Sequence, residues 1–97
     1  MIIVHVTYKA NGKANLDGYL QEITQHNVPA LSRAESGCHQ YDFFTGAEAH
    51  NHGSLFLLEQ WEDQAALDFH LNSAHYKSLQ PIKDKWGIEM QAQRFEV

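Results

Sequence analysis

The chain has 97 residues, 43% of them hydrophobic and 20% charged, and its formal net charge is −5 at pH 7. This length allows one domain, and the composition is that of a globular protein rather than a disordered chain. The seven lysines and arginines are scattered along the sequence, so we expect binding neither to nucleic acid nor to an anionic membrane surface.

Cysteine content and the first residues bear on location. The single cysteine, Cys38, excludes an intramolecular disulfide and a cysteine-based zinc site. The apolar run at the start alternates, lacks a basic leader and is too short for a signal peptide or a membrane span. We therefore expect a cytoplasmic protein.

The first half of the chain predicts a strand, a broken helix and a second strand. Residues 2–10 are β-branched and aromatic, with apolar side chains on both faces. Asn15 is the expected N-cap of a helix that runs into the high twenties, where Pro29 breaks it. A further turn or two ends at Ser36-Gly37, and residues 38–45 form the second strand.

The second half predicts a third strand, two helical pieces and a fourth strand. Residues 54–62 contain an apolar run typical of a central strand. Asp63 is the expected N-cap of the next helix and Ser73 that of another, which Pro81 kinks or ends. Residues 88–97 alternate imperfectly and form the last strand.

The order of elements is β-α-β-β-α-β, which predicts an α+β, ferredoxin-like domain spanning residues 1–97, with a four-stranded antiparallel sheet and helices on one face. With right-handed crossovers, we expect the strands that flank each helix to be parallel neighbours. The other face of the sheet carries enough apolar side chains to predict a homodimer packed sheet to sheet.

His70 is the first candidate for a functional residue. It shares one helix face with Leu67, Leu71 and Ala74, so we expect it to face inward. One interpretation is a core histidine bonded to a backbone carbonyl. The other is a base or hydrogen-bond donor that lines a cavity, tuned by a nearby carboxylate such as Glu59.

Aromatic and histidine side chains on neighbouring elements complete the predicted pocket. Tyr41 and Phe43 share one face of their strand, and Trp61 has matching parity on the next, so these rings either pack the core or bind a flat ligand. His75 either closes the same pocket or lies in solvent. His5 reaches either the pocket or the dimer face.

No motif for a bound cofactor is present. The sequence lacks a glycine-rich phosphate loop, a nucleophile elbow, HExxH and CxxC. His50 and His52 resemble a pair of metal ligands, but the linker 46–53 that carries them supplies no third placed ligand. We therefore expect neither a cofactor nor a metal.

Three spaced motifs resemble the antibiotic biosynthesis monooxygenase family. They are ESGCHQYD at 35–42, LEQWE at 58–62 and ALDFHLNSAHYK at 66–77. The resemblance covers nearly the whole chain and implies a ferredoxin-like homodimer with a pocket between sheet and helices. Glu59, Trp61, His70 and His75 match the recurrent polar and aromatic residues of this family, and Tyr41 matches its strand tyrosine.

Members of this family include haem-degrading enzymes alongside quinol monooxygenases, cofactor-free oxygenases and an isomerase. In the haem-degrading members, the pocket tryptophan would fall at His70 and the haem-ligating histidine at Gln80. Because neither residue type is present, the resemblance does not imply haem.

The main hypothesis is a cofactor-independent monooxygenase that acts on a small hydroxylated aromatic, such as a quinol or a polyketide-like phenol, with dioxygen. His70, oriented by Glu59, would remove a phenolic proton, while Trp61, Tyr41 and Phe43 would hold the ring. Two alternatives remain: an isomerase or hydratase of a small metabolite with the same base, and a non-catalytic dimeric binding module.

Overall fold

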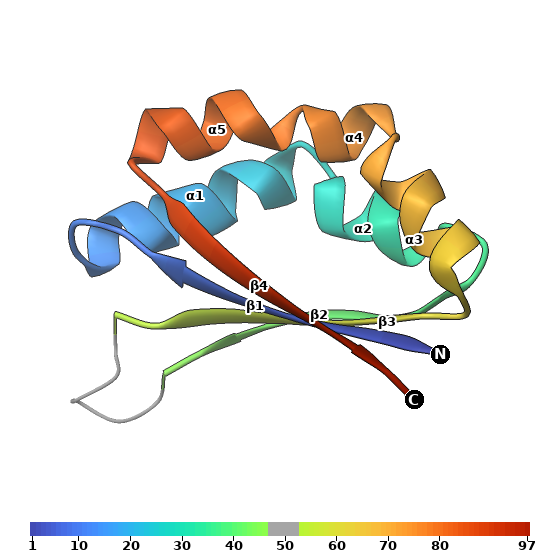
Figure 1. Cartoon of the computed structure of the whole chain (residues 1–97). Coiled ribbons are helices and arrows are strands. Elements are labelled where there is room, and N and C mark those ends of the chain that lie inside the picture. Colours follow the sequence, from blue (N-terminus) through green and yellow to red (C-terminus); the bar gives the residue numbers. More distant parts are fainter. Residues whose placement is uncertain (47–52) are drawn as a thin grey trace.

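A computed structural model describes residues 1–46 and 53–97. A single four-stranded sheet carries all the helices on one face, as Figure 1 shows. The elements are β1 (Ile2–Lys9), α1 (Lys13–Gln25), α2 (Val28–Arg33), β2 (Cys38–Thr45), β3 (Leu55–Trp61), α3 (Gln64–Leu71), α4 (Ala74–Lys77), α5 (Leu79–Trp86) and β4 (Glu89–Glu96). This confirms the ferredoxin-like βαββαβ arrangement.

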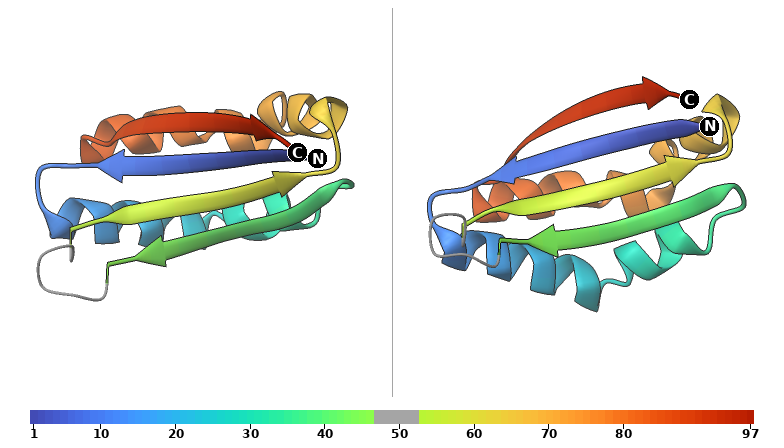
Figure 2. Two further views of the ribbon diagram at one scale, coloured as in Figure 1. Left: turned by 60° about the horizontal axis from the view of Figure 1, so that its bottom comes forward. Right: turned by 90° about the horizontal axis from the view of Figure 1, so that it is seen from below.

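The strands lie in the order β2-β3-β1-β4, and each pairs antiparallel with its neighbour (Figure 2). The strands that flank each helical region therefore run parallel, but another strand separates them. The expectation that they are direct neighbours was wrong, because each crossover skips one strand. Both chain ends lie at the same end of the sheet (Figure 2), where the backbones of Met1 and Val97 form two 3.0 Å hydrogen bonds.

Alternation along the two central strands decides which side chains face the helices. In β1, Ile2, Val4, Val6 and Tyr8 are buried, and in β3 the buried side chains are Leu55, Leu57, Glu59 and Trp61. Since side chains of a strand alternate between faces, this single set forms the floor of the core. Edge strand β4 is different, because all eight of its residues are exposed.

Local signals explain most of the helix boundaries. Asn27 adopts a left-handed conformation (φ 60°), and Pro29 lies in the first turn of α2, so the predicted break before Pro29 is confirmed. Asp63 accepts a hydrogen bond from the Ala66 amide and caps α3, as expected. Asn15 is not the N-cap of α1, which begins after Gly12; the Asn15 side chain donates instead to the Trp86 carbonyl of α5.

The last helical region divides at Ser78 rather than at Pro81. Ser73 caps α4 through the Tyr76 amide, as expected. Pro81 lies in the first turn of α5, which continues to Trp86. The prediction that Pro81 kinks or ends the helix was wrong, because the first turn of a helix has no use for the amide hydrogen that proline lacks.

The face of the sheet away from the helices is partly apolar. His5 lies there between Phe56 and Phe95, with ring centroids 5.4 and 5.0 Å away. Phe44 and Phe95 are 50% and 44% exposed. Within the described ranges, none of the helices is long and apolar enough to cross a membrane.

Candidate active site

A cavity of about 180 Å³ lies between the sheet and the helices. Its inner walls are apolar and include Val4, Val6, Leu57 and Leu67. It extends to residues of β4, all of them exposed, so it opens beside that strand. A cavity of roughly 150 Å³ is enough to hold benzene, so this one has room for a small aromatic molecule.

All four tyrosines of the chain line this cavity, and they come from four different elements: Tyr8, Tyr19, Tyr41 and Tyr76. Burial raises the pKa of each phenol above its ordinary value. The tyrosines therefore remain protonated at neutral pH. Each phenol presents an aromatic ring and a hydroxyl that can donate a hydrogen bond.

Glu59 is the acidic group of the cavity wall. It lies in the middle of β3, opposite Tyr41 of β2 in the register, and is only 6% exposed. Burial raises the pKa of the Glu59 carboxyl to about 7, although a 2.9 Å hydrogen bond from the Trp61 indole Nε1 opposes the shift. Such a carboxyl exchanges a proton readily near neutral pH, as a general base must.

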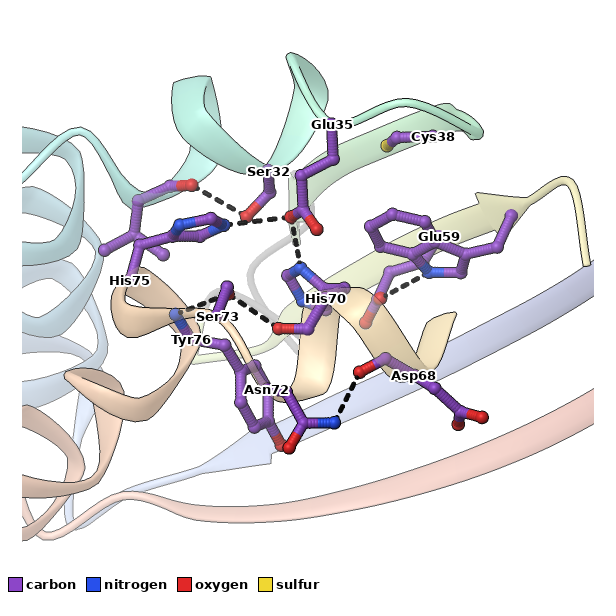
Figure 3. A network of polar contacts seen from close by, with 12 residues as sticks. Ser32, Glu35, Cys38, Glu59, Asp68, His70, Asn72, Ser73, His75 and Tyr76 are labelled. Atoms are coloured by element: carbon purple, nitrogen blue, oxygen red, sulfur yellow. Dashed lines mark hydrogen bonds and ion pairs between the residues drawn. The ribbon is translucent and has the colours of Figure 1, made fainter. Parts of the chain in front are cut away.

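A second polar cluster lies behind this cavity and joins three elements, as Figure 3 shows. His70 Nδ1 lies 2.6 Å from Glu35 Oε2, and His75 Nε2 lies 2.9 Å from the same oxygen. The Glu35 and His70 side chains are 5% and 1% exposed. Because the carboxylate can only accept, both imidazoles donate to it through these nitrogens.

Hydrogen bonds of Ser73 hold this cluster in place. The Ser73 hydroxyl donates to the His70 carbonyl at 2.6 Å and accepts from the Tyr76 amide (Figure 3). It thus fixes the turn between α3 and α4, the two helices that carry His70 and His75. Glu35 approaches from the segment after α2. Within that helix, the buried Ser32 hydroxyl donates a 2.8 Å hydrogen bond to the Val28 carbonyl.

The predicted pairing of Glu59 with His70 is wrong. Glu35 takes the place of Glu59 as the partner of His70, and Glu59 accepts from Trp61 instead. His70 does not line the cavity. Its ring packs against those of Trp61 and Tyr76, with centroids 4.6 and 5.1 Å away. Burial lowers the pKa of the His70 imidazole, and Glu35 opposes that shift.

The other predicted residues divide between the cavity and its surroundings. Tyr41 lines the cavity, whereas Trp61 lies behind Glu59 and is fully buried. Phe43 packs against the rings of Tyr41 and Tyr8. His75 neither closes the cavity nor lies free in solvent, since it is bonded to Glu35.

Of the two positions expected for His5, the substrate pocket was wrong, and the side chain lies on the face of the sheet away from the helices. The alternation of β1 turns Val4 and Val6 toward the helices and His5 toward the opposite face, where it contacts Phe56 and Phe95. The His5 imidazole cannot enter the cavity, because the sheet lies between them.

Glu35, His70 and His75 are also the residues that could hold a metal ion, since their ligand atoms all lie within 4.8 Å of one another. Two imidazoles and a carboxylate are a familiar donor set for divalent metals. His50 and His52, which resemble a pair of metal ligands in the sequence, lie outside the described residues.

Glu35 and the two cations of the cavity were not among the residues predicted from the sequence. Glu35 opens the motif at 35–42, and an acid at that place was a usable signal. Lys83 and Arg94 line the cavity from α5 and β4. Neither stands in a motif, and only the folded chain brings them together.

Fold and site together define a small ferredoxin-like protein with an apolar, tyrosine-lined cavity between sheet and helices. The sequence profile of the family described as "Antibiotic biosynthesis monooxygenase" matches residues 1–81. The chain therefore belongs to the antibiotic biosynthesis monooxygenase family.

One curated relative is the "Putative monooxygenase YcnE" of Bacillus subtilis (strain 168), which is 40% identical over 59 residues. The alignment covers 61% of this chain and 55% of YcnE, so the match spans about half the length of that protein.

Two solved structures show the same fold. A "putative antibiotic biosynthesis monooxygenase" from Deinococcus radiodurans superposes with a TM-score of 0.82 at 19% identity, over 100% of this chain and 92% of the other. PA3566 from Pseudomonas aeruginosa gives a TM-score of 0.71 at 26% identity, over 99% of this chain and 94% of the other.

Proposed function

We propose that this protein is a cofactor-independent monooxygenase that acts on a small hydroxylated aromatic, a quinol or polyketide-like phenol, with dioxygen. The observation that carries the proposal is the position of Glu59, a carboxylate with a pKa of about 7 in the wall of an apolar cavity lined by four tyrosines. An apolar cavity lined by aromatic rings suits a flat phenol, and the Glu59 carboxylate can accept the proton of its hydroxyl.

The first step is proton transfer from the phenol to Glu59. The Trp61 N–H bonded to Oε1 fixes the carboxylate and favours its charged form. General-base assistance of this kind contributes roughly 10²–10⁴ in rate. The role assigned to His70 in the initial hypothesis passes to Glu59, because Glu59 lines the cavity and His70 does not.

The remaining steps follow from the chemistry of the phenolate. The anion passes one electron to dioxygen, and the phenoxyl radical and superoxide then combine at a ring carbon ortho or para to the oxygen that carries a hydrogen. The new peroxide takes up the proton held by Glu59. Loss of the hydrogen from that ring carbon and cleavage of the O–O bond release water and leave a quinone, so one oxygen atom enters the product and the other leaves in water.

His70 acts in this scheme as a positioning residue. Its ring stacks on the Trp61 indole, and Glu35 holds it in one orientation through Nδ1. The pair therefore keeps the indole N–H directed at Glu59. The tyrosine rings enclose the substrate ring and keep water away from the reactive anion.

The proposal is tested by oxygen consumption with a panel of quinols and polycyclic phenols. Wild-type protein is compared with Glu59→Gln, which keeps an oxygen for the Trp61 bond but cannot accept the proton. The matched control is Glu62→Gln, three residues along the chain and 62% exposed. We expect oxygen uptake to fall at least about tenfold in Glu59→Gln and to remain unchanged in Glu62→Gln.

Two outcomes contradict the proposal. Uptake that survives in folded Glu59→Gln excludes Glu59 as the base. No uptake with any substrate, combined with proton exchange into a small carbonyl compound, supports the isomerase, and ligand binding without either reaction supports the binding module.

A further inference from the structure

The mouth of the cavity carries positive charge, although the chain as a whole is acidic. Of the seven lysines and arginines in a chain of net charge −5, Lys83 and Arg94 line the cavity. They come from α5 and from β4, the strand beside which the cavity opens. The acidic group of the cavity, Glu59, is buried in the middle of β3. It shares a cross-strand row with Arg94, since both pair with Val4 of β1, whereas Lys83 lies beside Met90, which pairs with Tyr8.

Lys83 has no acidic partner across the mouth. Its ammonium lies 3.6 Å from the Met90 sulfur, which is a weak acceptor. Burial lowers the pKa of the Lys83 ammonium, and the adjacent Asp84 opposes the shift only partly. Among the described residues, no carboxylate lies within ion-pair distance of Lys83. An ammonium that has lost part of its water without gaining a counter-charge is open to an anion.

Arg94 is held at the mouth by neutral and charged partners. Its Nε and Nη2 donate to Gln64 Oε1 at 3.0 and 2.6 Å. Glu96 Oε1 lies 3.4 Å from Nη2 and is 71% exposed, so solvent screens this pair. The guanidinium is thereby bonded to Gln64 and Glu96, whereas Lys83 lies beside Met90, four residues before Arg94 on β4. In the described part of the chain, Lys83 is therefore the cation of the lining that is left without a counter-charge.

We propose that the aromatic ligand of this cavity carries a carboxylate, which lies at the mouth against Lys83 while its hydroxyl faces Glu59. This assignment rests on the proposed function only for the aromatic ring and the hydroxyl. Charge-assisted bonds from ammonium and guanidinium groups are among the strongest that a carboxylate can accept. The two ends of the ligand are thus distinguished, and the ring can enter in one orientation only.

The negative charge of Glu59 supports the orientation in which the hydroxyl of the ligand, and not its carboxylate, lies at Glu59. A carboxylate placed beside Glu59 would oppose its ionisation in a desolvated space, as two close carboxylates do. A phenolic hydroxyl at that end donates to Glu59 instead. The cavity therefore accepts one anion, and Lys83 at the mouth decides where it lies.

The experiment measures anaerobic binding of two matched probes, 2-naphthol and 6-hydroxy-2-naphthoate, by titration calorimetry. The probes share the ring and the hydroxyl and differ in a carboxylate at the opposite end. We expect the naphthoate to bind about tenfold more tightly to the wild-type protein. Lys83→Met should remove most of this preference and leave the affinity for 2-naphthol unchanged.

The chain offers a matched control in Lys85, two residues along α5. Its ammonium pairs with Glu22 at 2.7 Å and is 61% exposed, and it does not line the cavity. Lys85→Met should bind both probes as the wild type does.

The inference is overturned if the wild type binds both probes equally, if Lys83→Met weakens both alike, or if Lys85→Met reproduces its effect. These outcomes are independent of turnover, because oxygen is absent. Selective naphthoate binding by a protein that never consumes oxygen would refute the monooxygenase proposal and retain the anion site. Oxygen uptake with neutral quinols, without any preference for the acid, would do the reverse.

Discussion

The indole Nε1–H of Trp61 donates a 2.9 Å hydrogen bond to Oε1 of Glu59, two residues earlier on the same strand. The indole also stacks on His70, with ring centroids 4.6 Å apart. One fully buried tryptophan therefore links the carboxylate of the cavity to the Glu35–His70–His75 cluster behind it. Changes in that cluster reach the cavity through the orientation of this ring.

Replacing Trp61 by phenylalanine should move the pH profile of oxygen uptake. Activity of the wild type should rise through about pH 7, since Glu59 must lose its proton to act as a base. The indole bond lowers the pKa of Glu59, so its loss in Trp61→Phe should shift the midpoint of kcat/KM upward. NMR titration of Glu59 gives the same readout without turnover.

Trp86→Phe is the control for this variant. The Trp86 indole, on α5, donates at 3.0 Å to Glu22 of α1 and does not contact Glu59. Trp86→Phe should leave the midpoint where it is. An unchanged midpoint in folded Trp61→Phe would show that the indole does not tune Glu59.

Glu59→Gln should also change how stability depends on pH. The pKa of Glu59 is about 7 in the folded state and 4.5 in an exposed carboxyl, so between these values the folded state binds more protons than the unfolded state. The free energy of unfolding therefore falls as pH rises through this window, by an amount on the order of 3 kcal/mol.

The glutamine variant lacks this contribution. Urea unfolding at pH 4, 6 and 8 should show that the free energy of unfolding of Glu59→Gln increases relative to that of the wild type as the pH rises. This relative increase should end above about pH 7.5. A constant difference between the two proteins across the series would mean that Glu59 titrates normally.

Periodicity predicted the strands well because it reports which side of a sheet is buried. The run from Leu55 to Trp61 alternates as the structure does, and the caps at Asp63 and Ser73 depend on bonds within four residues. The predicted helix start at Asn15 was wrong, because the Asn15 side chain donates to the carbonyl of Trp86, 71 residues away, and does not cap the helix.

Long-range partners could not be predicted in the same way. The alternation along the strand and the spacing along the helix predicted that Glu59 and His70 face each other. Such patterns do not show which carboxylate bonds to a given imidazole. Glu35 lies 35 positions before His70 in the chain. Only the packing of the segment after α2 against α3 and α4 brings the two together.

Loss of Glu35 should destabilise the fold. Glu35→Ala leaves the Nδ1–H of His70 buried without an acceptor, which costs about 1–3 kcal/mol. Glu62→Ala removes a carboxylate that pairs with His39 at the surface, and should change stability by less than about 0.5 kcal/mol. Urea unfolding of the two variants at pH 7 provides the comparison, and equal losses would contradict a structural role for the buried cluster.

Removing metal ions should not affect oxygen uptake. In the cluster of Glu35, His70 and His75, Oε2 of the carboxylate already accepts from both imidazoles, so each of these two donors has a partner without a metal ion, although the buried Oε1 has none in the part of the chain that the structure describes. Protein dialysed against EDTA should retain its rate, and elemental analysis should find metal well below one equivalent. Stoichiometric metal, together with activity that zinc or iron restores, would show a metal centre instead.

We expect a homodimer formed through the face of the sheet opposite the helices. Phe44 and Phe95 are half exposed on that face, and a charge placed there should prevent association. Light scattering after gel filtration should give the mass of a dimer for the wild type and of a monomer for Phe44→Glu. Phe69→Glu, on helix α3 and 68% exposed, is the control and should remain dimeric. A monomeric wild type would overturn this expectation.

Strand β4 is an edge strand with every residue exposed, and it is also one wall of the cavity. Segments of this kind open with the smallest free energy in a protein, because few packed side chains hold them. The amide hydrogens of β4 should therefore be the first in the sheet to exchange with deuterium. A molecule bound beneath the strand would slow that exchange, so the least protected strand of the fold would report directly on occupancy of the cavity.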